Sequence, residues 1–162
     1  MGVKSGPRIP SRGSEFELIK GGTFEVATDI TDNWTAFTST TLSLQSNGSP
    51  GNCMRTLSGS GVRGGAYQDI GTIVGQVYKI IVHMNKGTSG TVAYFVGTTG
   101  SERTLIGASY ETDSTASGWT RHENEFTASA TTTRVSVVSR DSVSTDYSEF
   151  DMVSVKPVSS PL

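Results

Sequence analysis

The stretch GWTRHENEFTASATTTRVSVVSRD, residues 118–141, decides the fold class. Charged residues cluster after its tryptophan, a run of Ser, Thr and Ala follows, and then Val135 and Val137 alternate with polar residues. Such alternation is typical of a strand with one buried face, and threonine suits a strand because its branched Cβ fits the pleat. We therefore interpret TASATTT as a strand end and a turn, and its many hydroxyls do not indicate polar chemistry.

The same alternation recurs along the whole chain. VYKIIVHMNKG, residues 77–87, places four apolar residues on one face, namely Tyr78, Ile80, Val82 and Met84. A first strand is expected over residues 16–26, broken at Gly21 and Gly22. About ten such segments are separated by Gly or Ser/Thr clusters, without helical periodicity between them. This pattern predicts an all-β sandwich or barrel.

Length and composition limit the classes of function. A chain of 162 residues fits one domain, and a domain of that size buries roughly 70% of its unfolded surface. Serine and threonine contribute 45 residues and glycine 19, which is typical of short strands with tight turns. The net charge of −2 and the lack of a Lys/Arg stripe argue against nucleic acid as a partner. No apolar run is long enough to predict a membrane span.

The ends of the chain are interpreted separately from the domain. Residues 1–14 are rich in Gly, Pro, Arg and Ser, and GSEF at residues 13–16 resembles a cloning-site scar, so we predict a disordered or vector-derived tail. Residues 15–158 are expected to form a single domain, followed by a C-terminal tail over residues 159–162. Cys53 is the sole cysteine, so an internal disulfide is impossible, and it does not decide between secretion and the cytosol.

Five motifs resemble those of carbohydrate-binding modules of families 4, 9 and 22, and of the wider galactose-binding-like jelly rolls. In chain order they are LIKGGTFEV with DNW (18–34), GNCMRT (51–56), AYQDIGTIVGQVYKIIVHMN (66–85), GWTRHENEFTASATTTRVSVVS (118–139) and EFDMVSVKPV (149–158). The resemblance covers residues 17–158. It implies a two-sheet antiparallel β-sandwich, a jelly roll, with sugar bound on a concave sheet or at loop tips.

The resemblance also implies a structural calcium ion. It places Glu25 beside Asp151 of the last strand, with the carbonyl of Gly22 and those of the loop at Asn52 completing a shell of hard oxygens. Met152 stands where the family has a second aspartate, which removes one typical oxygen ligand. The alternative is that Glu25 and Asp151 are ordinary surface carboxylates.

A sugar site is expected on the outward side of the strand at 77–87, with the AYQDI segment as its neighbouring strand. Hydroxyl-rich ligands need planar polar groups for hydrogen bonds and an aromatic ring for stacking. The expected ligand-binding residues are polar or aromatic side chains that face outward: Tyr67, Gln68, Lys79, His83, Arg134 and Arg140. The alternative is a solvated sheet face.

Other candidate residues have less specific interpretations. Trp34 and Trp119 are possible sugar platforms, but core packing is favoured at both positions. His122, like His83, lacks metal-ligand spacing, which argues against a transition metal. Glu123 and Glu125 lie two residues apart on one face, as a glycosidase pair could. Nothing in the sequence raises either pKa, so catalysis is not expected.

Three functions remain open from the sequence. The leading hypothesis is a non-catalytic module that binds a polysaccharide or cell-surface glycan, outside the cell or on a virion surface, within a secreted enzyme or a phage particle. The alternative is a phage tail or capsid domain that mediates protein contacts or self-association without binding sugar. A small glycosidase is the third hypothesis.

Overall fold

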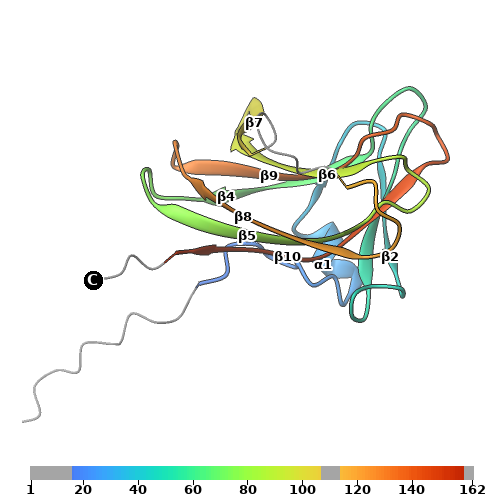
Figure 1. Ribbon diagram of the computed structural model, residues 1–162, viewed down its shortest axis with the longest axis horizontal. Helices are drawn as coiled ribbons and strands as arrows, with labels where there is room; N and C mark the ends of the chain where they lie inside the picture. Colours follow the sequence, from blue (N-terminus) through green and yellow to red (C-terminus); the bar gives the residue numbers. More distant parts are fainter. Residues whose placement is uncertain (1–15, 107–113, 159–162) are drawn as a thin grey trace, which may run out of the picture.

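The computed structural model describes residues 16–106 and 114–158, which form two antiparallel five-stranded sheets in two layers (Figure 1). In spatial order, sheet A contains β1 (Thr35–Ala36), β4 (Gly65–Gly71), β9 (Thr132–Ser139), β6 (Val92–Thr98) and β7 (Ser101–Ile106). Sheet B contains β2 (Thr41–Gln45), β3 (Cys53–Leu57), β10 (Tyr147–Pro157), β5 (Val77–Asn85) and β8 (Thr120–Thr127). The predicted all-β sandwich is confirmed, whereas the predicted tails at 1–14 and 159–162 lie outside the described residues.

The core lies between the sheets and follows the alternation in the sequence. The four apolar residues of β5 predicted to face inward are each at most 3% exposed. Val135 and Val137 of β9 belong to the same core cluster from the opposite sheet, and both are fully buried. Burying an aliphatic side chain of this size contributes about 1.5–3 kcal/mol to folding. The turn between β8 and β9 lies where TASATTT predicts it.

Residues 16–26 do not form the expected strand. Gly21 and Phe24 have φ angles of 60° and 49°, and this left-handed backbone interrupts an extended conformation. The segment still lies beside the last strand, because the Leu18 amide donates to the carbonyl of Val155 at 2.9 Å. A short helix that the sequence analysis missed, α1 (Ala27–Thr31), follows. Its five residues are too few to show a helical period.

The last strand of sheet A, β7, does not simply extend the sheet. It pairs with β6 at two positions with an irregularity between them. In Figure 1 it stands above β9 and β6, on the side of sheet A that faces away from sheet B. No helix in the described ranges is long or apolar enough to cross a lipid bilayer.

Candidate functional site

The outer face of sheet A carries an aromatic ring in contact with an arginine. Tyr67 of β4 and Arg134 of β9 point outward, because the alternate residues Gln68 and Val135 are buried. The guanidinium carbon of Arg134 lies 3.7 Å from the centre of the Tyr67 ring. This is a cation–π contact, in which the guanidinium covers part of the ring.

Two carboxylates hold Arg134 in this position. Asp69, opposite Arg134 in the strand register, accepts hydrogen bonds from Nε at 2.7 Å and Nη2 at 2.8 Å, and Glu102 of β7 accepts from Nη1 at 3.4 Å. These contacts raise the pKa of Arg134, and the hydrogen bonds to Asp69 have the largest effect. The arginine side chain is 17% exposed and each carboxylate 34%. We call Tyr67, Asp69, Glu102 and Arg134 the sheet A cluster.

Beside the sheet A cluster, the outer face of the sheet is covered. Phe37 packs against a second apolar cluster of Ala93, Phe95 and Val138, which are each at most 4% exposed. The guanidinium of Arg103 on β7 lies over the ring of Phe95 at 4.3 Å. Solvent therefore reaches this face mainly along β4 and at Arg134.

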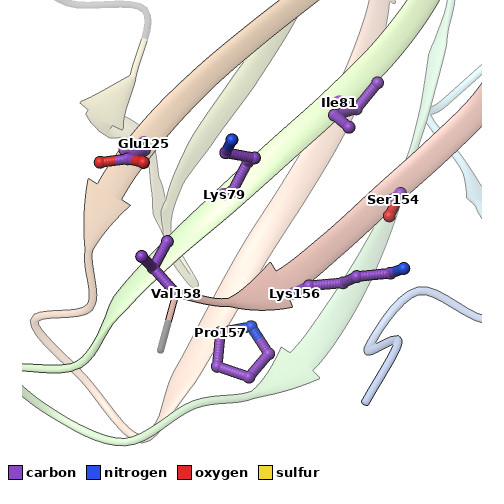
Figure 2. Close-up of a pocket in the computed structure, with 7 residues that line it drawn as sticks. All are labelled: Lys79, Ile81, Glu125, Ser154, Lys156, Pro157 and Val158. Carbon is purple, nitrogen blue, oxygen red and sulfur yellow. The ribbon is translucent and has the colours of Figure 1, made fainter. Parts of the chain in front are cut away.

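The outer face of sheet B contains a shallow depression of about 280 Å³ (Figure 2). In Figure 2, Lys79 and Ile81 of β5 lie between Glu125 of β8 and Ser154 and Lys156 of β10. Pro157 and Val158 complete the described lining, which includes no aromatic ring. These residues offer hydrogen-bond partners to sugar hydroxyls but no aromatic ring on which a sugar could stack.

Lys79, one of the charged residues that line this depression, is paired with a carboxylate of β8. Lys79 Nζ lies 2.8 Å from Glu123 Oε1, and Arg121 also pairs with Glu123. The hydrogen bond from Lys79, and then that from Arg121, lowers the pKa of Glu123, and the first of these bonds raises the pKa of Lys79. Glu123 therefore stays ionised and does not provide the protonated carboxyl that glycoside hydrolysis requires.

The structure separates residues that the sequence analysis placed in one groove. Tyr67 and Arg134 are in contact on sheet A, whereas Lys79 and His83 lie on β5 in sheet B. The expectation that the β4 and β5 segments are neighbouring strands is wrong, because the chain crosses from one sheet to the other between them. The six expected residues therefore do not share one surface.

Gln68 and Arg140 lie away from the Tyr67–Arg134 contact. Gln68 is 8% exposed. Its amide nitrogen donates to the carbonyls of Lys20 and Asn33, and its oxygen accepts from the Lys20 amide. It therefore fastens the N-terminal segment to β4. Arg140 follows β9 and, six residues after Arg134, lies roughly 20 Å away along an extended chain.

Asp151, one of the expected calcium ligands, is fully buried on the outer side of sheet B. Its two oxygens accept hydrogen bonds of 2.7 Å from the backbone amides of Ser49 and Met152. Burial raises the pKa of Asp151, and the negative charge of Glu25 raises it further, whereas the two amides and His83 act in the opposite direction. Glu25 is thus close enough to Asp151 to repel it.

The surroundings of this carboxylate pair fit a hard cation in donor type. Asn52 donates to the backbone carbonyl of Glu25 at 2.8 Å, so it positions Glu25, and the carbonyl of Gly22 accepts from the Val153 amide at 2.9 Å. Phe24 and Met152, the neighbours of the two carboxylates, both have a φ of 49°, a costly conformation that is often found at ligand sites. Within the described ranges, no three His, Cys, Asp or Glu side chains gather. A calcium ion would therefore depend largely on peptide carbonyls.

Sheet B contains a buried polar network that the sequence did not predict. Glu149 is 1% exposed and accepts hydrogen bonds from Arg55 Nε at 3.1 Å and Nη2 at 2.6 Å, and from the side-chain amides of Asn47 and Asn85. We call these four residues the Glu149 network. Its members are up to 102 residues apart in the chain, so no local sequence motif predicts this network. Cys53 lies beside it, and burial raises the pKa of this thiol to about 12.

The two tryptophans have different environments. Trp34 is 6% exposed and packs against Phe24, with ring centres 5.6 Å apart, so its predicted core role is confirmed. Trp119 is half-buried, and its indole nitrogen donates to the backbone carbonyl of Asn47 at 2.9 Å. Trp119 is therefore hydrogen-bonded to Asn47, a member of the Glu149 network.

No protein-family model matches the sequence, and no curated protein does. Solved structures match most of the chain. The CBM22-1 xylan-binding domain of Xyn10C from Paenibacillus barcinonensis is similar with a TM-score of 0.64 and 12% identity, over 86% of this chain and 94% of that domain. Modules of families 4, 16 and 61 are also among the similar structures. The protein therefore has the fold of carbohydrate-binding modules.

The fold also occurs as a part of larger proteins. An arabinose-bound GH51 α-L-arabinofuranosidase matches with a TM-score of 0.65 and 19% identity, over 88% of this chain and 26% of the enzyme. The enzymatically active domain of tailspike protein 4 from bacteriophage CBA120 matches with a TM-score of 0.59 and 10% identity, over 85% of this chain and 20% of that chain. This chain thus spans about a quarter or less of these two proteins.

Proposed function

We propose that this domain is a non-catalytic glycan-binding module and that it contacts sugar through the sheet A cluster. The observation that carries the proposal is the Tyr67–Arg134 contact with two partly exposed carboxylates, on one outer face of a carbohydrate-binding-module fold. Asp69 and Glu102 offer acceptor oxygens to sugar hydroxyls, and the phenol of Tyr67 both donates and accepts. The depression on sheet B supports sugar binding less, because its described lining has no aromatic ring.

The test is a glycan array followed by titration calorimetry of each sugar that binds. We expect a dissociation constant on the order of micromolar to millimolar. Tyr67→Ala should weaken binding about tenfold or more, which corresponds to about 1.4 kcal/mol. Tyr147→Ala is the matched control, because Tyr147 also lies under an arginine, Arg55 at 3.8 Å, but on sheet B. Equal losses in the two variants would contradict the assignment to sheet A.

The non-catalytic part of the proposal rests on Glu123. Its ion pairs with Lys79 and Arg121 keep it ionised, so Glu123 cannot act as the proton donor of a catalytic pair. We expect the protein to release no reducing ends from soluble polysaccharides. Release that Glu123→Gln abolishes would overturn this expectation.

We also propose that a structural calcium ion is bound between Glu25 and Asp151. Support comes from the repulsion between these carboxylates and from the left-handed residues beside both of them. A ligand at a hundredfold excess over its dissociation constant stabilises the native state by about 2.7 kcal/mol. Chelator should therefore lower the melting temperature, and Glu25→Ala should remove that difference. An identical melting curve with and without chelator would argue against the ion.

For its context we propose an extracellular setting, within a secreted enzyme or on a phage particle, as similar modules in an arabinofuranosidase and a tailspike suggest.

A second candidate function is protein contact without sugar. It is favoured by Ile73 and Val74, which are 70% and 58% exposed in the turn between β4 and β5. Self-association on gel filtration that Ile73→Ser abolishes, together with an empty glycan array, would select this second function.

A further inference from the structure

We propose that the sheet A cluster recognises the end of a glycan or a short oligosaccharide, and not the interior of an extended polysaccharide. This inference rests on the proposed function and adds the form of the ligand. It follows from which parts of the outer face of sheet A are open and which are closed.

The β6 side of the face is closed by β7. The chain folds back so tightly that a Cβ on Gly97 of β6 would lie 2.1 Å from the carbonyl oxygen of Ser101, where β7 begins. Glu102 then reaches Arg134 at 3.4 Å, and Arg103 lies over Phe95 at 4.3 Å. These contacts hold β7 on the outer face, where it stands above β9 and β6 in Figure 1.

One end of β4 is closed by Phe37. A Cβ on Gly65, the first residue of β4, would lie 2.7 Å from the ring of Phe37, so the ring covers this position. Phe37 also lies beside Tyr67, with ring centres 6.1 Å apart. Because Arg134 pairs with Asp69, farther along β4, Tyr67 stands between Phe37 on one side and Arg134 on the other.

The opposite end of β4 is open. A Cβ on Gly71, the last residue of this strand, would meet no atom of residues 16–106 or 114–158 within 4 Å. A sugar chain can thus approach from Gly71, pass Asp69 and Arg134, and end at Tyr67 and Phe37. The accessible strip from β1 to β9 is about 10 Å wide, because neighbouring strands lie about 4.8 Å apart.

A chain that crosses the strands at right angles has no path over the rest of the sheet. The outward residues of β9 and β6 beyond Arg134 are at most 4% exposed, namely Ala93, Phe95, Ser136 and Val138. An internal stretch of polysaccharide needs a surface that is open at both ends, whereas a chain terminus needs one open end. The closed end at Phe37 and the open end at Gly71 match a terminus.

The test is calorimetry with xylo-oligosaccharides and β-1,4-galacto-oligosaccharides from dimer to hexamer, each with a free and with a borohydride-reduced end. We expect the affinity to stop increasing by the trimer. If the domain recognises the reducing end of the sugar, borohydride reduction of that end should also change the affinity. A rise of tenfold or more from trimer to hexamer would overturn the inference but leave the proposed function intact. If neither the native protein nor Tyr67→Ala binds either series, both the inference and the proposed function are contradicted for these sugars.

Two variants open the closed sides. Phe37→Ala removes the block at Gly65, and Arg103→Ala removes the contact that holds β7 over Phe95. In either variant we expect a new dependence on chain length, with the hexamer bound severalfold more tightly than the trimer. Circular dichroism and the melting temperature show whether each variant is folded. Folded variants whose affinities for trimer and hexamer stay equal would contradict the role of these walls.

Discussion

Replacement of Arg55 by alanine should cost this domain a large share of its stability. Arg55 donates two hydrogen bonds to Glu149, which is 1% exposed, and Asn47 and Asn85 supply the remaining donors. Removal of one partner from a buried ion pair costs about 3–5 kcal/mol. We expect the lower end, about 3 kcal/mol, because the Arg55 side chain is 27% exposed and two amides still contact Glu149.

The assay is urea unfolding followed by intrinsic fluorescence, with the slope of the free energy against urea unchanged. For a domain of this size the loss corresponds to a decrease of roughly 6–12 °C in melting temperature. Arg121→Ala is the control, because Arg121 pairs with Glu123 at a side-chain exposure of 51%, and an exposed pair contributes at most about 1 kcal/mol. A loss for Arg55→Ala no larger than that of the control would refute the reasoning.

Three further predictions concern single residues. Phe150→Ala should lower the free energy of unfolding by about 3–5 kcal/mol in urea, because Phe150 is fully buried in the core. Burial lowers the pKa of His122 from its ordinary value of 6.5. As the pH decreases below 6.5, the unfolded chain therefore binds a proton at this histidine more readily than the folded domain does, and stability should fall. His122→Gln should flatten a plot of melting temperature against pH in this range. Burial raises the pKa of Asp151, so in the presence of chelator the domain should lose stability as the pH rises through that pKa and this carboxylate ionises. Added calcium should therefore raise the melting temperature, measured by calorimetry, more at pH 7 than at pH 4. A calcium effect that is the same at both pH values would contradict this last prediction.

The sequence predicted which side of each strand is buried but not which strands are neighbours. Alternation assigned Ile80 and Val135 to the core, because a period of two specifies the two faces of a strand. It carries no information about the sheet to which a strand belongs. The crossing between β4 and β5 was therefore predicted as a pairing, although Tyr67 and Lys79 lie on different sheets.

The candidate site shows the same division between local and distant information. Tyr67 and Arg134 were selected as outward residues of their own strands, and the structure brings them into contact. Asp69 and Glu102, which hold Arg134, were not selected, because they are separated from it by 65 and 32 residues. Contacts at such distances depend on the order of the strands, which no local pattern contains.

The bonding of the N-terminal segment to β10 has a consequence for how the domain bears load. The amide of Leu18 donates to Val155 and the carbonyl of Gly22 accepts from Val153, so the segment runs antiparallel to the strand. Both described ends therefore leave the domain on the same side (Figure 1). A force that separates these ends breaks the bonds one after another, like a zip, and does not load them together in shear. In single-molecule stretching we therefore expect the first segment to detach at low force while the two sheets stay folded.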